Sequence, residues 1–163
     1  MTILVKHQGG AAILASFLIA FMLTALPLPD WAEAWRPPWV TLVLIYWCLA
    51  VPERVGVGIG WMLGLLLDVM TGTLLGQHAL GLSLVAFIAL RFHKRVRVLP
   101  LWHQGIFVCL LVLLERSLGA WVKGIQGLPG SDTLVFAPAA TSALLWPWVF
   151  IILRDVRRKY RVA

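Results

Sequence analysis

Small or polar residues recur at every fourth position between residues 56 and 76, in the segment GVGIGWMLGLLLDVMTGTLLG. The series is Gly56, Gly60, Gly64, Asp68, Gly72 and Gly76, so a single aspartate interrupts a stripe of glycines. Three kinds of site use such residues: a phosphate-binding loop, an intramembrane carboxylate, or a surface on which helices pack closely. A dinucleotide-binding loop follows a strand and opens a helix beside an aqueous cleft. The GVGIG motif begins a long apolar segment instead, which excludes a nucleotide site.

Helix packing accounts for most of the stripe. Residues four apart lie on one face of a helix, and repeated small residues allow membrane helices to approach closely. We therefore interpret Gly56, Gly60 and Gly64 as a groove on one helix, continued by Gly76 and Gly81 around the next.

Asp68, Glu115 and Arg116 are charged residues inside apolar segments. A charged side chain within a membrane span costs about 2.5–3.5 kcal/mol on insertion scales, so it normally has a partner or faces water. At 1.5 Å per residue, Asp68 lies roughly 20 Å above the inner end of its helix, and Glu115 and Arg116 about 24 Å above theirs. One hypothesis is an ion pair between Asp68 and Arg116. The alternative is that each group extends separately to the outer interface.

Other arrangements for catalysis or metal binding are weak. An intramembrane aspartyl protease needs two aspartates within spans, and Asp68 is alone, since Asp30, Asp132 and Asp155 fall in loops or at an end. Ser83 and His78 lie five residues apart without an oxyanion motif, and no histidine pair has metal-ligand spacing. Cys48 and Cys109 both lie in apolar runs, where a free cysteine behaves as a small hydrophobic residue. We expect no enzymatic activity, no metal and no cofactor.

The elements that position these residues are membrane spans. Of the 163 residues, 61% are hydrophobic and only 13% are charged. Apolar runs near 20 residues are long enough to cross a bilayer core of ~30 Å. We predict an all-α polytopic membrane protein in which residues 1–163 form one transmembrane domain. Its six transmembrane helices are expected at about 9–28, 38–52, 55–70, 73–92, 99–122 and 134–153. The first is interpreted as an uncleaved span, because its apolar core is longer than that of a cleaved signal.

The positive-inside rule tests that count. With the N-terminus in the cytoplasm, one side of the membrane holds 11 of the 14 basic residues, namely Lys6, Arg54, Arg91, Lys94, Arg95, Arg97, Arg154, Arg157, Arg158, Lys159 and Arg161. Arg36 and Lys123 fall on the other side, and Arg116 lies within a span. An odd number of spans would separate the two richest clusters, so the distribution favours six spans with both termini inside.

The net charge of +7 is concentrated on this cytoplasmic face. Basic residues beside a membrane attract anionic lipids, at about 1 kcal/mol per residue. Lipid contact therefore explains Arg91, Lys94, Arg95, Arg97, Arg157, Arg158 and Lys159 more simply than nucleic acid does. Docking of an acidic cytoplasmic partner is the alternative.

The chain closely resembles the rod shape-determining MreD family of Gram-negative inner membranes. The resemblance extends over nearly the whole chain and lies in the order and spacing of several motifs. These are Arg36-Pro37-x-Trp39, Tyr46-Trp47, Pro52-x-Arg54, the glycine stripe from Gly64 to Gly76 with Asp68, the PLW motif at 100–102, and the LWPW motif at 145–148 followed by basic residues.

That resemblance implies a non-enzymatic component of the peptidoglycan elongation machinery that maintains rod shape. Its implied partners are MreC, the actin-like MreB filament, a transglycosylase and the penicillin-binding protein paired with it. The resemblance also implies a fold similar to the substrate-binding subunits of energy-coupling-factor transporters. The predicted outer loops are short and mildly polar, unlike those that usually enclose a vitamin.

Two functions follow as alternatives. A membrane scaffold would bind MreC by helix packing within the membrane, and the 56–76 stripe is the predicted docking surface. A small-molecule-binding subunit of a transporter would instead hold its ligand in an outward cavity beside Asp68.

Overall fold

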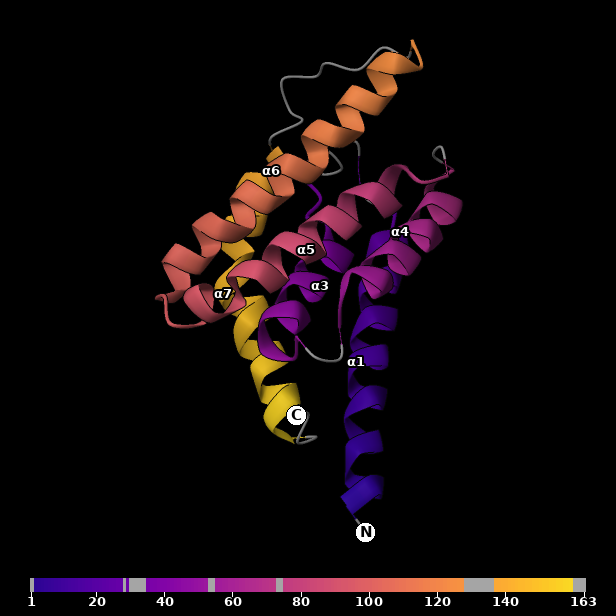
Figure 1. Ribbon diagram of the computed structural model, residues 1–163. Helices are drawn as coiled ribbons and strands as arrows, with labels where there is room; N and C mark the ends of the chain where they lie inside the picture. Colours follow the sequence, from indigo (N-terminus) through magenta and orange to yellow (C-terminus); the bar gives the residue numbers. More distant parts are fainter. Residues whose placement is uncertain are drawn as a thin grey trace.

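A computed structural model describes residues 2–27, 29, 35–52, 55–72, 75–127 and 137–159, with the backbone alone for residues 2–9. Within these ranges the regular secondary structure consists of α-helices (Figure 1). The structure does not describe Asp30, Arg54, Asp132 or Arg161.

Helix α3 (Trp39–Ala50) forms the centre of the fold. Every residue from Val40 to Leu49 is buried, including the polar Thr41 and the large Tyr46 and Trp47. A helix that is apolar on all sides is stable only when other elements surround it. Helices α1 (Thr2–Ala25), α5 (Gln77–Arg97), α6 (Leu101–Ile125) and α7 (Ala137–Lys159) pack against it.

Helix α4 (Val57–Thr71) lies at the edge of the bundle and packs mainly on α5 (Figure 1). Its two faces differ in side-chain size. Gly60, Leu63, Gly64, Leu67 and Asp68 are buried, whereas Trp61, Met62, Leu66 and Val69 are exposed. The α4–α5 pair is therefore a hairpin with a glycine-rich inner seam and a bulky apolar outer face.

The six described helices correspond to the six predicted segments, with ends that differ by several residues. Among them, α6 and α7 are both long enough and apolar enough to cross a membrane by length and composition. Helices α3 and α4 are apolar but short, with 12 and 15 residues. The all-helical prediction is thus confirmed, while the crossing of the membrane by each helix stays a prediction.

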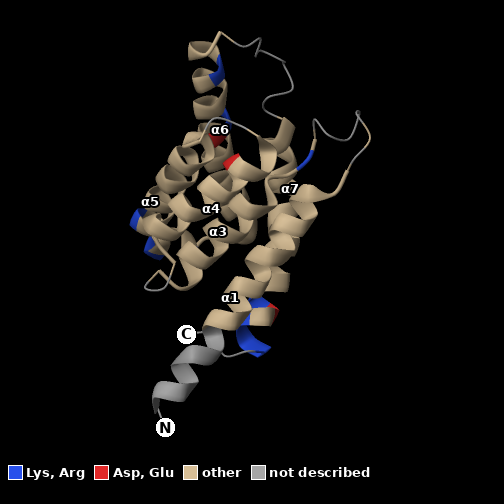
Figure 2. Ribbon diagram, turned by 90° about the vertical axis from the view of Figure 1, so that its right-hand side faces the viewer, with Lys and Arg blue, Asp and Glu red and all other residues tan. Residues whose placement is uncertain are grey.

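The ends of the helices carry most of the charge. Helix α1 begins, and helix α7 ends, toward the same end of the molecule (Figure 1). Basic residues lie mainly near helix ends, whereas most of the ribbon carries no charged residue (Figure 2). On the described part of the chain, α5 and α7 have Lys94, Arg95, Arg97, Arg157, Arg158 and Lys159 in their last turns.

Candidate functional site, a buried helix cap at Asp68

Asp68 is on the last turn of α4, with a side chain that is buried and a residue exposure of only 1%. Its carboxylate accepts hydrogen bonds from the backbone N–H groups of Gly76 and His78, both at 2.8 Å, and from that of Ala79 at 3.5 Å. The His78 ring nitrogen Nδ1 lies 2.8 Å from the same carboxylate. Asp68 therefore caps the first turn of the following helix.

Two glycines create this geometry. Gly72 ends α4 with φ 72° and Gly76 precedes α5 with φ 103°, both in the left-handed region that favours glycine. The short connection brings the end of one helix beside the start of the next. The first N–H groups of a helix lack partners within it, and its N-terminal end favours negative charge. These interactions offset the cost of placing a carboxylate in an apolar region.

The glycine stripe packs against the chain's own α5. A Cβ built at Gly64 would lie 2.3 Å from Ala79 Cα, and one at Gly60 would lie 2.9 Å from the carbonyl oxygen of Leu82. Gly56 is looser, with Leu90 Cδ1 3.9 Å from its built Cβ. The first three glycines therefore belong to an internal helix seam, and Gly72 and Gly76 to a turn.

This arrangement corrects the predicted docking surface. A helix of MreC cannot occupy the face of Gly60 and Gly64 while α5 fills it, because backbone atoms of α5 already lie within contact distance. The sequence pattern identified a packing face but not its occupant, since the stripe's spacing is the same for an internal and an external neighbour.

The hypothesis of an Asp68–Arg116 ion pair is also corrected. Among the described residues, the titratable side chain that contacts the Asp68 carboxylate is the His78 imidazole, whose Nδ1 lies 2.8 Å away. Glu115 is turned inward, where Thr41 Oγ1 donates a 2.8 Å hydrogen bond to its carboxylate, while Arg116 is half-buried. Gly81 of α5 allows this, because a Cβ built there would lie 3.1 Å from Glu115 Cγ. Glu115 thereby joins α6 to α3 and α5.

Three further polar contacts were not predicted from the sequence. Arg36 donates from its guanidinium to the carbonyl oxygens of Thr24 and Leu26 at the end of α1. Gln104 donates to the carbonyl oxygens of Val96 and Leu99 and accepts from Trp146 Nε1 at 3.2 Å. Trp47 Nε1 donates to Ser16 Oγ at 2.8 Å. Of these three contacts, the sequence offered a clue only for the first, because Arg36 stands before two prolines, where a basic side chain can cap the preceding helix.

The predicted basic residues lie at the surface. Arg91, Lys94, Arg95, Arg97, Arg158 and Lys159 are exposed, and Arg157 is half-buried. Arg154, on the same turn region of α7, lies with its guanidinium carbon 5.9 Å from the centre of the Phe150 ring. Both clusters therefore lie at the surface of the molecule.

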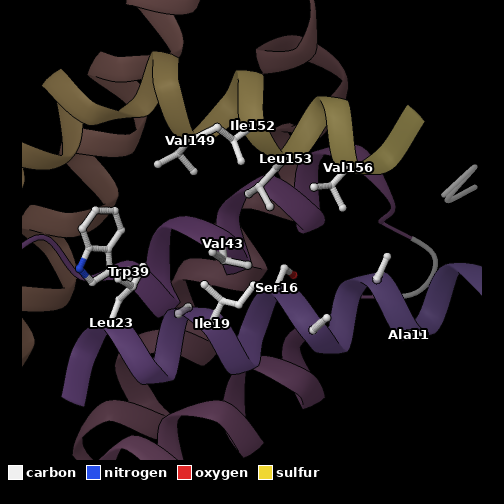
Figure 3. Close-up of a pocket in the computed structure, with 13 residues that line it drawn as sticks. Ala11, Ser16, Ile19, Leu23, Trp39, Val43, Val149, Ile152, Leu153 and Val156 are labelled. Atoms are coloured by element: carbon white, nitrogen blue, oxygen red, sulfur yellow. The ribbon is translucent and has the colours of Figure 1, made fainter. Parts of the chain in front are cut away.

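A cavity of about 550 Å³ opens between α1 and α7, with α3 behind it (Figure 3). Its lining is apolar apart from Ser16 and the indole of Trp39. Asp68 does not contribute to it. This cavity therefore lies in a different place from the outward cavity beside Asp68 that was predicted for a transporter subunit.

The buried polar groups described above connect helices rather than converge on a reaction centre. No group of three potential metal ligands occurs among the residues that the structure describes. Helix caps, close glycine contacts and exposed apolar faces together define a helical protein whose buried polar residues hold its own helices together.

Comparison with known proteins identifies the family. Residues 6–156 match the family model for the rod shape-determining protein MreD. The rod shape-determining protein MreD of Haemophilus influenzae is 39% identical over 150 residues, which cover 92% of this chain and 93% of that protein. No solved structure matches. The chain belongs to the MreD family, and is therefore a membrane protein that acts in cell shape as a structural component, not an enzyme.

Proposed function

We propose that this protein is a non-catalytic scaffold of the peptidoglycan elongation machinery in the bacterial inner membrane. It crosses the membrane six times with both termini in the cytoplasm, and it binds MreC through helix packing within the membrane. The actin-like MreB filament, a transglycosylase and its penicillin-binding protein are the further partners of this assembly, with membrane lipids at its basic face.

The exposed apolar faces are the observation that carries this proposal. Large side chains such as Trp61, Met62 and Leu66 on α4, and Ile106 and Leu110 on α6, are more than half exposed. Contiguous apolar surface of this kind marks contact with a membrane or a partner. The buried polar groups, by contrast, bond to neighbouring helices of the same chain.

Site-specific photocrosslinking in living cells tests the MreC contact. A photoreactive residue at Met62 or Leu66 samples α4, at Ile106 or Leu110 samples α6, and at Leu14 or Leu18 samples α1. We expect crosslinks to MreC at positions four apart on one of these faces. The buried Leu82 is the matched position that should give none. Inserted, functional variants that crosslink to MreC from no face would contradict the proposal.

A transporter subunit makes a different prediction, namely a small polar ligand bound by the purified protein. The apolar lining of the described cavity does not favour such a ligand. Native mass spectrometry of the purified protein distinguishes the two functions, because a co-purifying small polar molecule would support the transporter.

A further inference from the structure

The groove between α1 and α7 has walls of hydrocarbon. Ala11, Ala12 and Ala15 of α1 face Ile152 and Val156 of α7, and Figure 3 shows the side chains of α7 directed toward α1. The hydroxyl of Ser16 donates to the carbonyl oxygen of Ile13 at 2.6 Å and accepts from Trp47 Nε1. The hydroxyl is therefore satisfied within the protein, and the groove selects an apolar occupant.

The length of the groove matches that of an acyl chain in one leaflet. Its lining on α1 runs from Ala11 to Leu23, which is about 18 Å of helix. One leaflet is half of the ~30 Å bilayer core, or about 15 Å.

Charge lies at one end of the groove. Val149, Ile152, Leu153 and Val156 form the face that α7 presents to it. Residues three and four apart share a helical face, so the same face continues to Lys159, three residues beyond Val156. Arg158, beside it, is exposed. A basic turn at the end of a hydrocarbon groove is complementary to a lipid with an anionic headgroup.

We propose that this groove binds one anionic phospholipid of the inner leaflet. An acyl chain lies between α1 and α7, and the phosphate lies against the last turn of α7. The assignment to the inner leaflet rests on the orientation in the proposed function, whereas the lipid site itself does not depend on MreC.

Native mass spectrometry of the full-length protein with added phosphatidylglycerol tests the site. We expect one phosphatidylglycerol to remain bound to the wild type. Ala15→Trp fills the groove from an exposed position and should weaken binding at least about tenfold, because the loss of two buried methylene groups is sufficient for that. Leu18→Trp, on an exposed position of α1 outside the groove, is the matched control and should bind normally.

A second pair of variants tests the headgroup. Arg158→Gln with Lys159→Gln should reduce the preference for phosphatidylglycerol over phosphatidylethanolamine, whereas Lys94→Gln with Arg95→Gln should preserve it. Equal lipid binding by the wild type and Ala15→Trp would overturn the proposal. The proposal would also be overturned if Ala15→Trp disrupted a dimer, or a complex with MreC, that contains no lipid, because a protein would then occupy the groove. If the proposed membrane orientation were wrong, topology labelling would reveal it, and the number of lipids bound per protein would stay the same.

Discussion

At the scale of single residues, the charges inside this protein act as structural caps. Asp68 is the clearest case, because its carboxylate accepts backbone hydrogen bonds from the start of α5 and also contacts His78. A buried group of this kind is stabilising only while its partners are present. Its removal leaves the backbone N–H groups of Gly76 and His78, which are half-buried, without this acceptor.

Asp68→Ala should therefore destabilise the folded protein by about 2 kcal/mol or more, since each unsatisfied buried donor costs about 1–3 kcal/mol. Asp68→Asn should cost less, because the amide oxygen still accepts a hydrogen bond. Thermal unfolding of the detergent-purified variants measures both. Asp155→Asn changes an exposed acidic residue and is the control. Wild-type stability in Asp68→Ala would contradict the capping role.

Gln104 allows a second test at this scale. Its amide joins the carbonyl oxygens at the end of α5 to the indole of Trp146 on α7. Gln104→Leu keeps similar volume but removes these bonds, and should cost about 1–3 kcal/mol. His103→Leu changes the exposed neighbour and should leave the unfolding temperature nearly unchanged. A Gln104→Leu variant as stable as His103→Leu would show that these bonds contribute little.

Residue types were predictable here, but their partners were not. The sequence identified Asp68 and Glu115 as costly charges that need a partner. The partners proved to be backbone N–H groups across a turn and a threonine 74 positions away. A turn bounded by two glycines was the available clue for Asp68. No local pattern marks Thr41 as the neighbour of Glu115, because that contact depends on how α3 and α6 pack.

At the scale of helices, the seam between α4 and α5 depends on the absence of side chains. Backbone atoms of Ala79 occupy the space that a Cβ at Gly64 would need. In contrast, nothing lies within 4 Å of a Cβ built at Gly58, one turn and a half away on the same helix. The two glycines are therefore a matched pair.

Gly64→Ala should destabilise the protein by about 1–3 kcal/mol, near the upper end, because backbone rather than a flexible side chain must move. Gly58→Ala should be neutral or stabilising by up to about 1 kcal/mol, since alanine favours the helix. Unfolding of the two variants in the same detergent gives the comparison. Equal effects of the two substitutions would show that close α4–α5 packing is unimportant.

Helix positions were predictable because long apolar runs interrupted by Pro, Gly and charges leave few alternatives. The segment expected at 38–52 became α3 at Trp39–Ala50. Its place at the centre of the bundle was harder to predict, although its nearly uniform hydrophobicity is typical of a helix that other elements surround. Turn length alone does not predict the pairing of α4 with α5, because a similarly short connection joins α3 to α4 without close packing between them. The groove between α1 and α7 brings distant segments together, and no local pattern predicts it.

At the scale of the whole molecule, two of the helices are shorter than the thickness of a bilayer. Helices of 12 and 15 residues are about 18 and 22 Å long, less than a ~30 Å hydrocarbon core. If α3 and α4 cross the membrane as proposed, their ends lie at apolar depth, where unsatisfied backbone groups are costly. Asp68 caps the start of α5 and Arg36 the end of α1, so two helix ends that neighbour α4 and α3 along the chain have their backbone groups paired. The same polar contacts thus support both the fold and its placement in lipid.

The orientation proposed from the basic residues can be tested directly by cysteine labelling. Cys48 and Cys109, the two native cysteines, are first replaced by alanine. Lys94→Cys should then react with a membrane-impermeant maleimide only after the cytoplasmic membrane is permeabilised, because the positive-inside rule places it in the cytoplasm. Gln126→Cys, just beyond the end of α6, should react in cells whose outer membrane alone is permeable. Labelling of Lys94→Cys under that second condition would reverse the orientation, and with it the leaflet assigned to the bound lipid.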